Sequence, residues 1–69
     1  MLALGIDPGT AICGYGLVEM QGSRLKAVKY GAVLTSPKSR AEDRLLKIYN
    51  ELDALINEYK PDVMGVEQL

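Results

Sequence analysis

The fold of this chain depends on the stretch Leu2-Ala3-Leu4-Gly5-Ile6-Asp7-Pro8-Gly9-Thr10, which has the pattern of a short apolar strand ending in an aspartate and a turn. Its successive apolar residues predict a strand buried on both faces. Pro8 lacks the N–H that would continue a ladder and Gly9 accommodates a turn, so the strand should stop at Asp7. A second apolar stretch, Val63-Met64-Gly65-Val66, is followed by Glu67. Two carboxylates that follow strands on a rigid scaffold could together hold a hard divalent metal.

The composition indicates one small domain without disulfides. Sixty-nine residues form at most one domain, residues 1–69. Cys13 is the only cysteine and the chain has no histidine, which excludes a disulfide, histidine ligands for zinc and a cysteine–histidine catalytic pair. We therefore expect Cys13 to be a small buried apolar residue, and a single cysteine fits a reducing compartment.

The charge balance gives no sign of a nucleic-acid-binding footprint. Eight basic and nine acidic residues leave a formal net charge of −1. The basic side chains are expected to form a solvated surface; they include Lys26, Lys29, Lys38, Arg40 and Lys47. No apolar stretch has the length of a membrane span, and Met1-Leu2-Ala3 lacks the charged start of a signal peptide. We therefore expect the protein to be cytoplasmic and to have no membrane partner.

Turn residues, a capping motif and proline along the chain predict the order strand, strand, strand, helix, strand. The predicted strands cover residues 1–7, 12–20, 24–35 and 62–67, with a hairpin turn at Gln21-Gly22-Ser23. Ser39-Arg40-Ala41-Glu42 resembles a capping box that opens the helix, and Pro61 should force Lys60 out of helical geometry. Apolar residues at spacings of three and four predict one buried helical stripe, made of Leu45, Ile48, Tyr49, Leu52, Leu55, Ile56 and Tyr59.

These elements predict an α/β fold with strand order 3-2-1-4 and one crossover helix. Short turns make the first three strands an antiparallel meander, and a right-handed crossover places the fourth strand parallel to the first. Asp7 and Glu67 should then lie at the same ends of adjacent strands, about 4.8 Å apart, within reach of a shared metal ion. Gly14 and Gly16 lie two residues apart and should face one side of the sheet, where a ligand could approach the backbone closely.

The quoted motifs resemble those of the RuvC family of Holliday-junction resolvases. The resemblance covers the whole chain in order: Leu4 to Thr10, Gly14-Tyr15-Gly16, Arg44-Leu45, Pro61-Asp62 and Val66-Glu67-Gln68. It implies an RNase H-like fold with strand order 3-2-1-4-5. It also implies a Mg²⁺-dependent endonuclease, with Mn²⁺ as a substitute, that acts as a homodimer on four-way DNA junctions alongside the branch-migration proteins RuvA and RuvB.

The resemblance also assigns roles to particular residues. Asp7 would be the first-strand metal ligand and catalytic acid, Glu67 the fourth-strand one, and Gly14 and Gly16 would let a DNA backbone approach the sheet. The family's remaining acids lie beyond the length of this chain. We therefore expect a truncated RNase H-like sheet, the N-terminal part of a nuclease domain, that is inactive alone.

Other interpretations remain open at the level of sequence. The actin, sugar-kinase and Hsp70 superfamily has a similar first strand and would make this an ATP-binding piece, although Ala11-Ile12-Cys13 follows where a polar phosphate-binding residue is usual. RuvX-like nucleases share the first motif but normally lack the Glu67-Gln68 pair. A catalytically silent folding unit is the third possibility, in which Asp7 is an ordinary turn residue.

Overall fold

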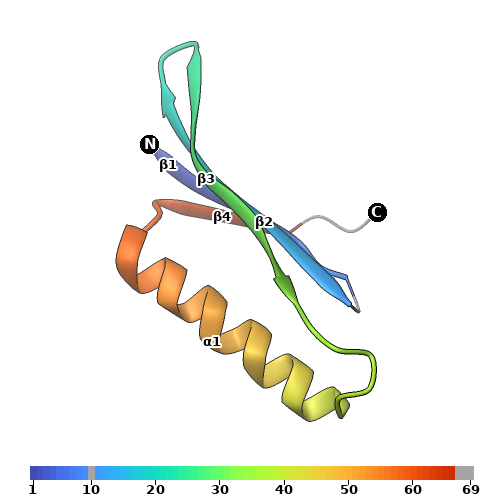
Figure 1. Ribbon diagram of the computed structural model, residues 1–69. Helices are drawn as coiled ribbons and strands as arrows, with labels where there is room; N and C mark the ends of the chain where they lie inside the picture. The colour runs from blue at the N-terminus through green and yellow to red at the C-terminus, as the bar shows by residue number, and fades with distance from the viewer. Residues whose placement is uncertain (10, 67–69) are drawn as a thin grey trace.

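The computed structural model describes residues 1–9 and 11–66 as one mixed sheet with one helix (Figure 1). The strands are β1 (Leu2–Asp7), β2 (Ile12–Gln21), β3 (Arg24–Leu34) and β4 (Val63–Val66), and the helix is α1 (Ala41–Tyr59). The sheet has the order β3-β2-β1-β4, with β1 antiparallel to β2 and parallel to β4, so the predicted order is confirmed. In the part of the chain that is described, no helix is long and apolar enough to cross a membrane.

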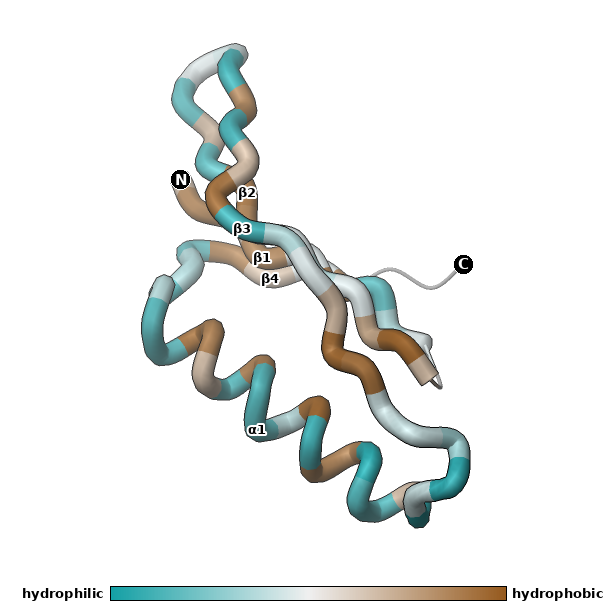
Figure 2. Tube along the Cα trace, viewed as in Figure 1, coloured by the Kyte–Doolittle hydropathy of each residue, from teal (hydrophilic) through white to brown (hydrophobic). Residues whose placement is uncertain are grey.

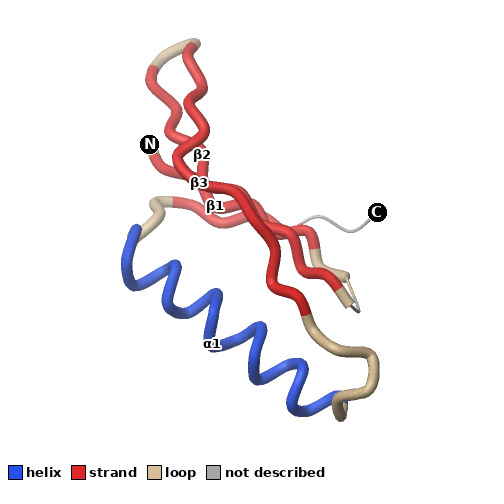
Figure 3. Tube along the Cα trace, viewed as in Figure 1, coloured by secondary structure: helices blue, strands red, loops and turns tan. Residues whose placement is uncertain are grey.

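A long hairpin of β2 and β3 projects beyond the end of β1 (Figures 1 and 3). Its loop is Gly22-Ser23, and Gly22 has φ +60°, a conformation that glycine adopts without steric cost and that suits two-residue hairpin loops. The backbone N–H of Met20 donates to the carbonyl of Met1 at 2.8 Å. The pairing of β1 with β2 stops there, and the rest of the hairpin extends past the N-terminal end of β1. We call residues 20–27 the hairpin arm.

The start of α1 differs from the predicted capping box. Arg40, not Ser39, is the N-cap residue, and no side chain caps the helix. The N–H of Ser39 donates to the carbonyl of Ser36 at 3.0 Å, so this N–H is not available to the Glu42 carboxylate as a capping box requires. Glu42 instead pairs with the guanidinium of Arg40 at 2.8 Å. At the other end, Lys60 adopts φ 49°, so the predicted helix end before Pro61 is confirmed.

The core lies between α1 and the sheet. Leu4, Leu17 and Leu55 form its buried centre, and Leu52, Ile56 and Tyr59 of the helix pack against it. The apolar residues recur along α1 turn by turn (Figure 2). Within the predicted stripe, however, Leu45 and Tyr49 are 68% and 65% exposed. Tyr49 lines an open groove with Met64 and Val66 because no described element lies beyond β4.

Among the described residues, no element covers the opposite face of the sheet, which we call the bare face, and this corrects the expectation that β1 is buried on both faces. Leu4 points to α1 and is 1% exposed, whereas Gly5 and Asp7 are exposed. In Figure 3 the single helix lies on one side of the strands only. Alternate residues of each strand therefore face solvent on the side away from α1.

Candidate functional site

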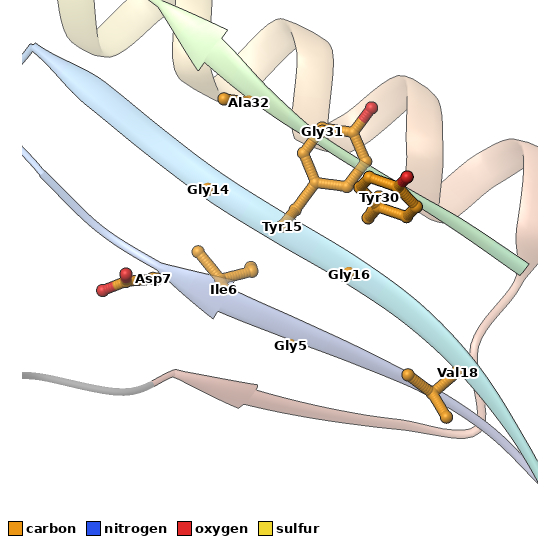
Figure 4. Close-up of a pocket in the computed structure, with 10 residues that line it drawn as sticks. All are labelled: Gly5, Ile6, Asp7, Gly14, Tyr15, Gly16, Val18, Tyr30, Gly31 and Ala32. Carbon is orange, nitrogen blue, oxygen red and sulfur yellow. The ribbon is translucent and has the colours of Figure 1, made fainter. Parts of the chain in front are cut away.

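Asp7 occupies the last position of β1, at the edge of the bare face. Its backbone pairs with Gly14 of β2, and its side chain is exposed (Figure 4). A Cβ built on Gly14 would lie 3.8 Å from the Asp7 Cβ, so a larger side chain there would crowd the carboxylate. The sheet thus holds the Asp7 backbone rigidly and leaves the carboxylate open to a ligand.

Asp62 fixes the alignment of β4 against β1. The Leu2 N–H donates to the Asp62 carboxylate at 2.8 Å, and the Asp62 N–H donates to the Leu2 carbonyl at 2.8 Å. The parallel ladder then runs from Ala3 opposite Val63 to Ile6 opposite Val66. Asp7 is the next residue of β1. Its expected partner, Glu67, lies outside the described residues, as does Thr10.

Glycines from three strands leave the bare face flat. Gly65 pairs with Gly5, and Gly5 pairs with Gly16, so three glycines lie side by side across the sheet. A Cβ at Gly16 or Gly65 would have no neighbour within 4 Å, which means that this surface is open to solvent. Together with Gly14 they form what we call the glycine surface.

Sequence reasoning identified half of the glycine surface. Gly14 and Gly16 do face one side, as predicted from their spacing. Gly5 and Gly65 were missed, although a signal was available. Each lies two residues before one of the two acids, Asp7 and Glu67, and therefore shares that acid's parity along its strand.

A shallow hollow of about 640 Å³ lies over the part of this surface formed by Gly5, Gly14 and Gly16 (Figure 4). Its lining includes Gly5, Asp7, Gly14, Gly16, Val18, Tyr30 and Ala32. Tyr30 stands at the β3 side and is 81% exposed, a large ring that no sequence pattern had marked. Among the described residues of the lining, Asp7 is the single charged one. A phosphate that approaches it would be repelled unless a cation lies between the two.

Cys13 is unsuited to nucleophilic chemistry. Its side chain is 2% exposed. Burial raises the pKa of the thiol, and the negative charge of Asp7 raises it further. The thiol therefore stays protonated, as expected for a structural cysteine.

The described residues offer one acid of a metal site and not a complete set of ligands. No cluster of three or more histidine, cysteine, aspartate or glutamate side chains occurs among residues 1–9 and 11–66. Asp7 alone cannot fill the six-oxygen shell of Mg²⁺, which usually combines one or two carboxylates with water and phosphate oxygens. A site at Asp7 needs further oxygen ligands from beyond these residues.

Comparison with known proteins identifies close relatives. Residues 3–69 match the family described as crossover junction endodeoxyribonuclease RuvC. The chain is 54% identical over 69 residues to the protein of that name from Heliobacterium modesticaldum and 51% identical to the one from Alkaliphilus metalliredigens. It spans 43% and 42% of their lengths, respectively.

Solved structures agree with this similarity. The whole chain superposes with a TM-score of 0.92 on 45% of the Thermus thermophilus RuvC determined in complex with a Holliday junction substrate, at 30% identity. An Aquifex aeolicus PPX-GPPA enzyme superposes with a TM-score of 0.77 at 17% identity, which shows a shared fold alone. The fold is therefore the RNase H-like one, and the chain belongs to the RuvC family of crossover junction endodeoxyribonucleases.

Proposed function

We propose that this chain supplies two metal-binding acids, Asp7 and Glu67, to a Mg²⁺-dependent endonuclease that cuts four-way DNA junctions. The observation that carries the proposal is the β1–β4 register. Ile6 lies opposite Val66, and each is followed in the sequence by one of the two acids. The names of the relatives and the junction-bound T. thermophilus structure support the choice of reaction and substrate.

The donor chemistry fits magnesium. Carboxylate oxygens are ligands for hard cations such as Mg²⁺ and Mn²⁺, and the chain has no histidine for a zinc site. In phosphodiester hydrolysis such ions activate water and neutralise the phosphate. The task of Asp7 is to hold the cation at the edge of the glycine surface, and the task of Glu67 is to provide a second carboxylate.

The glycine surface gives the DNA backbone room to reach that cation. With no side chain at Gly5, Gly14 or Gly16, a sugar–phosphate strand can lie against the sheet itself. The ATP-binding alternative finds less support, because the lining residues that the structure describes include no lysine or arginine to meet a nucleotide's phosphates.

The proposal also covers the oligomeric state, the protein partners and the cellular location. A four-way junction is two-fold symmetric, and paired cuts require two copies of the site, so the proposed enzyme acts as a homodimer. RuvA and RuvB are proposed as partners that bring the junction to it. A chromosomal DNA substrate places the proposed activity in the cytoplasm.

A chimera provides the test. All 69 residues of this chain would replace the matching segment of the H. modesticaldum relative, to which they are 54% identical. We expect the purified chimera to cut a synthetic four-way junction with Mg²⁺. Asp7→Asn and Glu67→Gln should each slow single-turnover cleavage by at least about a hundredfold, because a metal ligand is lost.

Matched variants separate chemistry from folding. Asp53→Asn changes an exposed acid of α1 that takes no part in the proposed site, and this variant should cut at the unaltered rate. All variants should show the same melting temperature. A folded chimera that cuts equally well with Asp7 or Asn at position 7 would refute the assignment.

A further inference from the structure

Positive charge is concentrated in one part of the chain. From Met20 to Arg40 there are five basic residues and no acidic one, although the chain as a whole carries a net charge of −1. This segment contains β3, which is an edge strand of the sheet. The acids lie elsewhere, with five of them in α1. The basic residues of β3 are Arg24, Lys26 and Lys29.

A β-bulge places these three side chains on one face. Leu17 pairs with Lys29, but its neighbour Val18 pairs with Ala27, so Val28 is an extra residue of β3. Without that extra residue, Lys26 and Lys29 would point to opposite faces, because their spacing is odd. With it, Lys29, Lys26 and Arg24 lie opposite alternate residues of β2, namely Leu17, Glu19 and Gln21. All three therefore face the side of the sheet that carries α1, and we call them the cationic strip.

Little negative charge opposes the cationic strip. Glu19 is the acid across from Lys26, but its carboxylate accepts a hydrogen bond from the N-terminal ammonium at 2.9 Å. The Lys29 ammonium lies 5.9 Å from the centroid of the Tyr59 ring. Among the described residues no acid forms a salt bridge with Arg24 or Lys26, and the strip residues are exposed.

The spacing of the strip matches a nucleic-acid backbone. Alternate residues of a strand repeat about every 6.6 Å, twice the rise of 3.3 Å per residue. One DNA strand carries a phosphate for roughly every 3.4 Å along the helix axis, and because the strand also winds around that axis, neighbouring phosphates lie roughly 7 Å apart, so the strip could meet successive phosphates. Lysine and arginine are the side chains that usually contact phosphates without reading sequence.

We propose that the cationic strip, Arg24, Lys26 and Lys29, binds the sugar–phosphate backbone of a second segment of DNA, away from the one at Asp7. Asp7 belongs to the bare face and the strip to the α1 side, so a single straight duplex does not serve both. A four-way junction offers several arms. The choice of DNA as the partner rests on the proposed function.

The test is the salt dependence of DNA binding by the 69-residue chain. Fluorescence anisotropy with a labelled four-way junction, in EDTA and from about 50 to 200 mM salt, measures how log affinity falls with log salt, and the absolute value of this negative gradient is here called the slope. The triple variant Arg24→Gln/Lys26→Gln/Lys29→Gln should lower this slope by roughly 2 to 3, about 0.9 per lost phosphate contact. The double variant Arg24→Gln/Lys26→Gln spares the Tyr59 contact and should lower it by about 2.

The control removes the same charge elsewhere. Lys38→Gln/Arg40→Gln/Lys60→Gln also takes away three positive charges and should lower the slope by less than 1. Equal losses in the two triple variants would show a net-charge effect and overturn the strip. An unchanged slope, or no salt-dependent binding by the wild type, would overturn it too and leave the lysines as protection of a sheet edge.

Failure of the proposed function would look different. That function is judged by cleavage in the chimera and its dependence on Asp7, whereas the strip is judged by binding without metal. A lowered slope in the strip variants would stand even if Asp7→Asn cut normally. Conversely, an Asp7-dependent cut with an unchanged slope would refute the strip alone.

Discussion

The glycine positions of the sheet differ in how much room each leaves for a side chain. A Cβ at Gly16 meets nothing within 4 Å, whereas one at Gly31 would lie 2.8 Å from the Tyr15 hydroxyl oxygen and 3.1 Å from its ring. We expect Gly16→Ala to raise the free energy of unfolding by about 0.5 kcal/mol, because it restricts the unfolded chain. Gly31→Ala should lower it by about 1 kcal/mol, because Tyr15 must move.

Urea denaturation measures both changes. In the chimera, Gly16→Ala should also slow junction cleavage, since the new methyl stands on the proposed path of the DNA backbone. Better stability together with slower cleavage separates a functional glycine from a structural one. Gly16→Ala with unchanged cleavage would contradict the role given to the glycine surface.

The buried thiol of Cys13 makes the stability of the folded chain depend on pH. Burial, followed by the charge of Asp7, raises the pKa of its thiol in the folded chain. Between the ordinary pKa of a thiol and this raised one, the unfolded state has lost a proton that the folded state keeps, so stability falls as pH rises. Below that window the contribution is constant.

Alkylation provides the measurement for Cys13. Iodoacetamide at pH 8 should modify the native thiol at least about tenfold more slowly than the thiol in denaturant, because only an exposed thiolate reacts readily. Asp7→Asn removes one cause of the raised pKa and should speed native alkylation slightly. Equal rates in native and denatured chain would disprove the buried, protonated thiol.

At the scale of elements, the alignment of β4 depends on Asp62. Its carboxylate accepts the N–H of Leu2 at 2.8 Å, in addition to the backbone hydrogen bond between the same two residues. Asp62→Ala should lower the free energy of unfolding by about 1 kcal/mol, the typical net value of one hydrogen bond. Faster amide exchange at Leu2 should accompany it.

A helix acid serves as the control for Asp62. Glu58→Ala removes an exposed carboxylate of α1 and should change stability by less than about 0.5 kcal/mol. Equal stability of Asp62→Ala and the wild type would mean that the parallel ladder alone sets the register. That result would weaken the argument that brings the two strand ends into line.

Local sequence signals predicted the elements well where one feature dominated. The turn at Gly22 and the helix end before Pro61 follow from backbone restrictions of glycine and proline, and both were confirmed. The capping box failed because Ser39 closes the turn from Ser36. Two competing local hydrogen bonds of similar strength cannot be ranked from sequence.

At the scale of the whole molecule, burial was harder to predict than topology. Short turns and one crossover restricted the strand order to 3-2-1-4, which was confirmed. The burial of β1, Leu45 and Tyr49 was overestimated, because an apolar pattern shows what could be covered and not whether a covering layer is present. The bulge at Val28 left no sequence signal, so the cationic strip could not be foreseen.

The free edge of β4 predicts self-association. Among the described residues β4 pairs only with β1, and its four residues are all exposed. An apolar edge with unpaired N–H and C=O groups can pair antiparallel with a second copy about a two-fold axis. Sedimentation at high micromolar concentration should show dimers, and Val63→Lys should favour monomers because edge lysines oppose pairing. A monomeric wild type with a cooperative melt would contradict this prediction.

The central claim is the proposal that Asp7, the last residue of β1, and Glu67, which follows β4 in the sequence, together hold a divalent metal, and NMR with Mn²⁺ tests it most directly. Substoichiometric Mn²⁺ should broaden the amide signals of Asp7 and Gly14 first. Asp7→Asn should abolish this selective broadening, while Asp53→Asn should leave it unchanged. Equal broadening with aspartate or asparagine at position 7, or broadening spread along the acidic residues of α1, would contradict the account.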